Sequence, residues 1–150
     1  MKKTNIISDR LHQQVPLSKH LGVNVSDYRD YAVTVEAPLE PNINSHGTAF
    51  AGSLYSVAAV TGVSLINLSL MDHGIEPSVL LVRAEVTYVK PVAHDIKASA
   101  VVEESTFKAF LGALKNKGKS RIDINIEVES DGEAAMTLAA HFAVLDKNRS

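Results

Sequence analysis

The second half of the chain alternates apolar and polar residues in a way that predicts β-strands. Segment 79–90 alternates over its whole length, and we expect its apolar side chains to face a core. These side chains belong to Leu80, Val82, Ala84, Val86 and Tyr88. The same period of two residues recurs in segments 31–39, 95–103, 120–130 and 133–145. Together these segments predict a sheet with one buried face.

Turn residues between these segments predict how the strands connect. Ser130, Asp131 and Gly132 stand between the last two segments and form a hairpin signal. Lys90 and Pro91, followed by residues 93–95, separate segment 79–90 from segment 95–103. We expect the strands of each pair to be antiparallel neighbours in the sheet.

The stretch between Glu40 and Asp72 contains no Asp, Glu, Lys or Arg. It is longer than the roughly 18 to 20 residues that cross a bilayer. Polar and small residues recur in it too often for a lipid-facing surface, and they include Ser53, Ser56, Thr61, Ser64, Asn67, Ser69, Gly52 and Gly62. We therefore expect residues 48–70 to form one long helix surrounded by its own protein, and no membrane span.

The remaining segments complete the predicted architecture. A short amphipathic helix is predicted over residues 8–20, ending before Gly22, and segment 105–114 fits either a bulged strand or a short helix. A curved antiparallel sheet wrapped around the long helix gives every apolar face a partner. The sequence thus predicts an α+β fold, one domain over residues 1–150, with an architecture similar to the hotdog fold.

The composition narrows the function classes. The apolar share of 45%, the charged share of 21% and the net charge of -2 are those of a globular protein and favour neither a nucleic-acid nor a membrane partner. The absence of cysteine excludes a disulfide, a thiolate nucleophile and Cys-ligated zinc. The six histidines form no pair four residues apart, so we predict no metal site. The polar N-terminus predicts a cytoplasmic protein.

Two motifs carry a resemblance to a known family. The stretch PNINSHGTAFAGSLYS (residues 41–56) and the strand RAEVTYVKPV (residues 83–92) resemble the thioesterase-type hotdog domain of YiiD-type proteins, over about residues 17–145. The resemblance implies a homodimer, with further pairing into a tetramer left open. It places the active sites at the subunit interface, near the start of each central helix. The implied ligand is an acyl thioester of CoA or acyl carrier protein, so that CoA or phosphopantetheine enters as part of the substrate and no separate cofactor is expected.

The same motif supplies candidate catalytic groups. Residues 45–48 can cap the long helix, and the backbone amides of Gly47 and Thr48 are candidate donors to the oxyanion of the thioester carbonyl. Many hotdog enzymes carry a carboxylate two turns into this helix. Here those positions hold Ser53, Leu54, Tyr55 and Ser56. The carboxylate base therefore needs a substitute.

Three substitutes for the missing base are available. His46 could act as general base, Asn44 or Asn42 could hold a water molecule, and Glu85 could reach the site from the other subunit. We rank His46 and Asn44 first. Structural roles remain open for all of these residues: the two asparagines as turn formers, His46 as a hydrogen-bonding group at the helix start, and Glu85 as a partner of Arg83.

Further residues are candidates for substrate binding. Ser53 and Tyr55 line either the pocket or the core, and Lys90 either meets a phosphate of the substrate or is solvated. The loop 112–120 contributes to a basic segment with Lys115, Lys117, Lys119 and Arg121. This segment is suited to an acidic carrier protein or the phosphates of CoA, although charged loops are usually only solvated.

The expected function is therefore a cytoplasmic acyl thioester hydrolase of fatty-acid metabolism. One alternative is a domain that binds acyl-CoA or acyl carrier protein without hydrolysis. Another, taken from longer relatives of the family, is an accessory role in fatty-acid synthesis.

Overall fold

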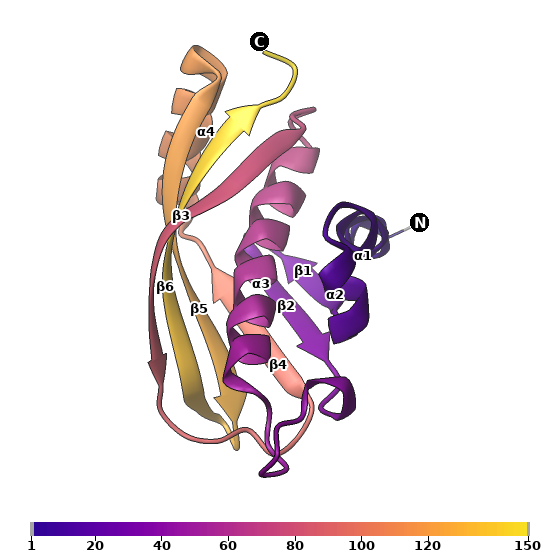
Figure 1. Cartoon of the computed structure of the whole chain (residues 1–150). Helices are drawn as coiled ribbons and strands as arrows, with labels where there is room; N and C mark the ends of the chain where they lie inside the picture. The colour runs from indigo at the N-terminus through magenta and orange to yellow at the C-terminus, as the bar shows by residue number, and fades with distance from the viewer. Residues whose placement is uncertain (1, 150) are drawn as a thin grey trace.

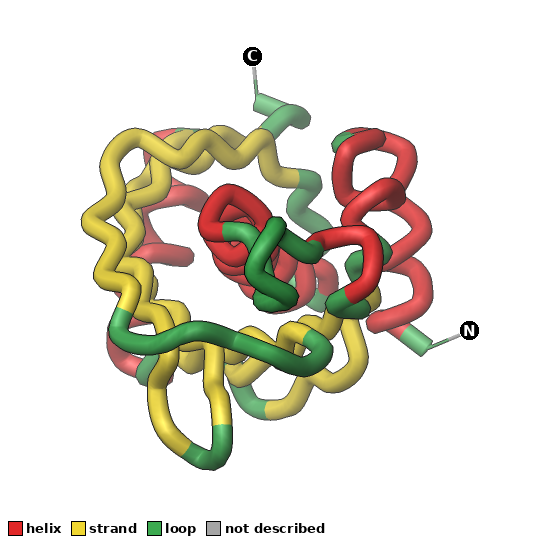
Figure 2. The backbone as a smooth tube through the Cα atoms, turned by 60° about the horizontal axis from the view of Figure 1, so that its bottom comes forward, coloured by secondary structure: helices red, strands yellow, loops and turns green. Residues whose placement is uncertain are grey.

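The computed structural model describes residues 2–149 and shows a curved antiparallel sheet around one long helix (Figure 1). The six strands are ordered β1-β2-β4-β5-β6-β3, and all of them pair antiparallel. Viewed nearly along the long helix, the strands curl around it on most sides (Figure 2). The predicted α+β architecture, with a curved sheet around a central helix, is confirmed.

The elements follow one another in a simple order along the chain. The strands are β1 (Asn24–Arg29), β2 (Ala32–Ala37), β3 (Pro77–Tyr88), β4 (Ile96–Val101), β5 (Lys119–Ser130) and β6 (Glu133–Asp146). The helices are α1 (Lys3–Gln14), α2 (Pro16–Leu21), the short 3-10 helix η1 (Glu40–Asn42), α3 (Ala51–Met71) and α4 (Glu104–Lys117).

The helix α3 is the centre of the molecule. It is long and apolar enough to span a membrane, with a mean hydropathy of 1.6, but 67% of that apolar window is buried inside the protein, as in the core helix of a globular fold. Its residues pack against β1 to β6 on one side and against α1 and α2 on another. The helix begins at Ala51, three residues later than predicted. The reason is that the amides of Ala49 and Phe50 donate to the carbonyl oxygens of Val92 and Asn42, which holds this backbone extended.

A close approach between α3 and the sheet occurs at Gly62. A methyl group built on Gly62 would lie 2.5 Å from Cζ of Phe142, whose ring is completely buried on β6. Real Cβ atoms essentially never come that close. The absence of a side chain at Gly62 therefore sets the distance between the helix and the sheet.

The connections differ in one respect from those predicted. β5 and β6 form the expected hairpin, with Asp131 (φ 54°) and Gly132 (φ 77°) in the left-handed conformation that a tight type I′ turn requires. The strands β3 and β4, however, are not neighbours: β3 pairs with β6 at the edge of the sheet, and β4 lies between β2 and β5. The connection 89–95 crosses the open end of the sheet (Figure 2), and its Val92 is fully buried. Turn residues alone did not reveal this crossing.

The side chains of β3 that face the core are not all the ones that we predicted. A register shift between Leu81 and Arg83 changes the phase of the alternation. Before the shift Val79 and Leu81 face the core, and after it Ala84 and Val86 do. Leu80 and Val82, which we expected to be buried, are 63% and 49% exposed on the outer face. Tyr88, at the end of the strand, is also 45% exposed.

Three further parts of the fold were predicted incompletely: the N-terminal helix, segment 105–114 and strand β1. The predicted helix 8–20 is two helices, α1 and α2, because Pro16 begins a new helix after Val15 leaves helical geometry. Gly22 ends the second one with φ 77°, as expected. Segment 105–114 is helical and belongs to α4. The strand β1 was missed, because the sequence NVSDYR lacks a clear alternation.

Replacing Gly62 with alanine should destabilise the protein by about 1–3 kcal/mol, because the added methyl group must displace Phe142 in a closed core. Gly112→Ala is the matched control, since a methyl group added to this helical glycine would have no neighbouring atom within 4 Å. The control should stabilise by about 0.5–1 kcal/mol through helix propensity. Urea unfolding midpoints measure both. Equal midpoints for the two variants would contradict the close contact.

Candidate functional site

The loop that leads into α3 is organised by one asparagine side chain. Oδ1 of Asn44 accepts hydrogen bonds from the amides of His46 (2.8 Å) and Thr48 (3.1 Å). Its Nδ2 group donates to Oγ1 of Thr48 at 2.9 Å. A bridge between Ile43 and Ala49 closes the loop at its base. Asn44 therefore holds residues 43–49 in a compact turn, and its polar atoms are engaged in that task.

This loop geometry corrects the predicted source of oxyanion donors. The amide of Thr48 donates to Asn44 Oδ1, and the amide of Gly47 donates to the Asn44 carbonyl oxygen at 3.3 Å. Gly47 has φ +80°, which favours glycine at this turn. Both residues lie outside the helix, and both amides already have partners within the loop. The premise that they are free helix-terminal donors is wrong.

The free donors of this region lie in the first turn of α3. In the described part of the chain, the amides of Ala51, Gly52 and Ser53 have no hydrogen-bond acceptor, as expected for the start of a helix without a capping side chain. These amides carry the positive end of the helix dipole. The ring of Phe50 lies against Gly52, where a Cβ atom would come within 2.5 Å of Phe50 Cε2. The glycine thus allows an aromatic ring to lie close to the helix start.

His46 is the accessible titratable group of the loop. Its backbone amide is held by Asn44, and its side chain is exposed and makes no hydrogen bond to residues 2–149. The loop lies at the end of the molecule where α3 begins (Figure 1). The side chain is therefore in contact with solvent at this end of the molecule.

Asn42 is tied into the structure more firmly than the sequence suggested. Its side chain is buried, and Nδ2 donates to the carbonyl oxygens of Leu21 and Pro38, each at 2.8 Å. Its own carbonyl oxygen accepts from the amide of Phe50. Asn42 therefore anchors the segment that leads to α3, which agrees with the structural alternative considered for this residue.

A tyrosine that the sequence analysis did not assign to the site joins β3 to the first turn of α3. The hydroxyl of Tyr88 donates to the carbonyl oxygen of Ala51 at 2.9 Å. Burial, and then the neighbouring Tyr55, raise the pKa of the Tyr88 phenol above its ordinary value, so the phenol remains a donor at neutral pH. Ser53 is buried and Tyr55 half-buried on the same helix end. The signal in the sequence was the position of Tyr88 within the RAEVTYVKPV motif.

Lys90 follows β3 closely and is paired with a carboxylate. Its Nζ atom lies 2.9 Å from Glu133 Oε2. The hydrogen bond from Lys90, and then its charge, lower the pKa of the Glu133 carboxyl. A phosphate would have to compete with Glu133 for this lysine.

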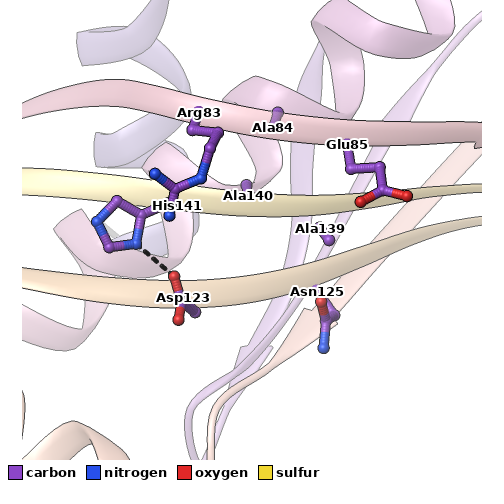
Figure 3. A pocket seen from close by; sticks show the side chains of 8 residues that line it. All are labelled: Arg83, Ala84, Glu85, Asp123, Asn125, Ala139, Ala140 and His141. Carbon is purple, nitrogen blue, oxygen red and sulfur yellow. Dashed lines mark hydrogen bonds and ion pairs between the residues drawn. The ribbon is translucent and has the colours of Figure 1, made fainter.

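The structure does not bring Glu85 together with His46 and Asn44. Glu85 lies on the outer face of β3, opposite the face that packs against α3 (Figure 3). It borders a shallow depression of about 620 Å³ with Arg83, Asp123, Asn125 and His141. Nδ1 of His141 lies 2.5 Å from Asp123 Oδ1, and Arg83 points toward the imidazole while Glu85 points away. Among residues 2–149 no ion pair joins Arg83 to Glu85.

Comparisons with known proteins identify the class of this fold. The structure is similar to that of a putative thioesterase from Shewanella oneidensis, with a TM-score of 0.87 and 23% identity over 95% of this chain and 96% of the other. A protein of unknown function from Chlorobaculum tepidum gives a TM-score of 0.86 and 24% identity over 96% and 94%. A protein from Pseudomonas aeruginosa described as a probable thioesterase gives a TM-score of 0.81 and 17% identity over 97% of both chains. These similarities establish the hotdog fold.

The family match is more specific than the fold. The family model described as "Putative thioesterase (yiiD_Cterm)" matches residues 4–146, and the chain belongs to this family. The resemblance drawn from the two motifs is confirmed. A thioesterase-type function is supported at this level.

Replacing Asn44 with alanine should release the loop, because two backbone amides and one hydroxyl lose their partner. We expect about 1 kcal/mol lower stability and faster hydrogen exchange at the amides of His46 and Thr48. Asn44→Asp keeps the acceptor and should preserve the protection of both amides. Unchanged exchange in Asn44→Ala, measured by NMR, would contradict the assigned role.

Proposed function

We propose that this protein hydrolyses acyl thioesters at the first turn of α3. The observation that carries the proposal is that the amides of Ala51, Gly52 and Ser53 have no acceptor among residues 2–149, in a chain that belongs to a thioesterase family. A thioester carbonyl directed at these amides gains stabilisation as its oxygen becomes negative. Losing one donor of this kind typically costs about 100- to 1000-fold in rate.

In the proposed reaction His46 activates the attacking water. The neutral imidazole takes a proton from water, and the hydroxide forms a bond to the carbonyl carbon, giving a tetrahedral oxyanion held by the helix amides. The oxyanion then collapses, the carbon–sulfur bond breaks, and the thiolate takes the proton from the imidazolium. The products are a carboxylic acid and the free thiol of CoA or of the carrier protein. Asn44 contributes by holding the loop that carries His46.

We propose a homodimer that completes the site. Four large apolar side chains are exposed near the start of α3: Ile43 (50%), Phe50 (55%), Tyr88 (45%) and Val89 (60%). The neighbouring strand β3 is the last strand of the sheet and has a free edge along its 12 residues. An exposed edge strand beside apolar side chains favours pairing with another strand. A second copy joined antiparallel along β3 would cover these residues and bring the surface of the partner against the first turn of α3.

The second candidate function is acyl-thioester binding without hydrolysis. It is favoured by two observations: α3 contains no carboxylate, and Asn44 is engaged within its own loop. Such a domain would use the same helix amides to hold the acyl carbonyl. The two functions differ in whether His46 acts as a general base on water.

Free-thiol release from a panel of acyl-CoAs of increasing chain length tests the hydrolase directly. His46→Ala should lower kcat by about 100- to 10,000-fold, because general base catalysis is lost. His20→Ala is the control, since His20 is an exposed histidine on α2 and should leave the rate unchanged. Thermal stabilisation by acyl-CoA without thiol release from the unmodified protein would instead support the binding domain.

The dimer is tested by a charge placed in the apolar surface near α3. Val89→Asp should weaken self-association at least tenfold by sedimentation velocity, because a carboxylate would be buried between the subunits. Val101→Asp, at an equally exposed valine at the end of β4, should have no effect. Equal behaviour of the two variants would exclude this surface as the interface.

A further inference from the structure

A basic groove crosses the outer face of the sheet, away from α3. It has a volume of about 490 Å³ and is lined by Leu80, Leu145, Lys117, Lys119 and Arg121, together with smaller residues. We use the name basic groove for these five residues. No carboxylate is among the residues that line it. The whole chain has a net charge of -2, so the positive character is local.

Strand register explains how the groove is assembled. Ser78, Leu145 and Lys119 lie side by side across β3, β6 and β5, and Leu80, Ala143 and Arg121 form the next row. Alternation along the strands turns both rows outward. Lys117, at the end of α4, forms the wall beside β5. The groove therefore has an apolar side at the sheet edge and a cationic side at α4.

The cations of the groove form no ion pair with a carboxylate within residues 2–149. Five lysines elsewhere form ion pairs, namely Lys3, Lys90, Lys97, Lys108 and Lys147. Over residues 2–149, neither lysine of the groove has such a partner, and Arg121 instead donates to Nε2 of His141 at 3.2 Å. The apolar side of the groove is also open to solvent, since Leu80 is 63% exposed and Leu145 is 51% exposed. A partner that offers carboxylates beside apolar side chains matches both sides.

The position of the groove connects it to the proposed dimer. Within one subunit the groove lies at the start of β3, after the end of α3, and the 21 residues of that helix put its first turn about 30 Å away. Antiparallel pairing of two β3 strands would set the start of one strand against the end of the other. The end of β3 is where Tyr88 contacts Ala51. In the dimer, the groove of one subunit would lie near the end of the partner's β3, on the opposite face of the sheet from α3.

We propose that the basic groove docks an acidic acyl carrier protein, which delivers the acyl thioester to the site of the other subunit. This inference rests on the proposed function, because it needs the dimer and the site at α3. A carrier protein is the occupant that we favour, because its carboxylates can meet the three cations while apolar side chains of its surface cover Leu80 and Leu145. Unpaired cations also accelerate the approach of an acidic protein.

Binding of the carrier protein can be measured independently of hydrolysis. We would titrate the protein with apo acyl carrier protein, which lacks the phosphopantetheine arm, by calorimetry at low salt. Lys119→Glu should weaken this binding at least tenfold, as should Leu80→Ser. Lys19→Glu on α2 is the matched control, with the same change in net charge, and should change the affinity less than twofold. Unchanged binding in Lys119→Glu would overturn the proposal.

Hydrolysis assays then distinguish a carrier protein from CoA as the anionic ligand of the basic groove. Lys119→Glu should lower kcat/KM at least tenfold for an acyl carrier protein substrate and leave the value for CoA with the same acyl chain unchanged. An equal loss for both substrates would mean that the groove binds CoA and would overturn the docking proposal. Lys119-dependent binding to anionic phospholipid vesicles, without binding to carrier protein, would also overturn it. Lys119-dependent carrier binding without hydrolysis of either substrate would support docking and reject the hydrolase.

Discussion

The burial of α3 is the constraint on which the rest of this structure depends. The helix is apolar on nearly all sides, and a flat sheet would cover only one of them. The sheet therefore curls around it, while α1 and α2 cover part of the remainder. The contact between Gly62 and Phe142 sets how deeply the helix lies in the sheet. A core of this kind leaves the ends of the helix in reach of other molecules, together with a half-buried stripe through Ala59, Val63 and Asn67.

The chemistry follows from what is left at the first of these ends. A helix start has free amides, and here no side chain caps them, because the N-cap residue Phe50 has no polar side-chain atom. Within residues 2–149 the amides of the first turn have no partner, and the exposed His46 precedes Ala51 by five residues in the sequence. The apolar residues around this end and the free edge of β3 give a second subunit a surface to cover. One arrangement thus accounts for the proposed site and the proposed dimer.

Much of the fold was predictable because it rests on periodicity. The alternating strands and the uncharged central helix are visible in the sequence, and so is the turn at Asp131 and Gly132. Strand order was not predictable, because the connection 89–95 is long enough either to turn back or to cross the sheet. The phase change in β3 was also hidden, since a bulge between Leu81 and Arg83 leaves no mark on an alternating sequence. The location of the candidate site came from its motif, but the choice of amides depended on where Asn44 places its oxygen.

The central claim is that the first turn of α3 receives the acyl carbonyl. A crystal structure with a 2-oxoalkyl analogue of acyl-CoA, in which a ketone replaces the thioester, tests it most directly. The account predicts the ketone oxygen within hydrogen-bond distance of the amides of residues 51–53, with a water molecule on the side of His46. A ketone oxygen bound instead by the amides of Gly47 and Thr48, or an acyl group seated away from α3, would contradict it.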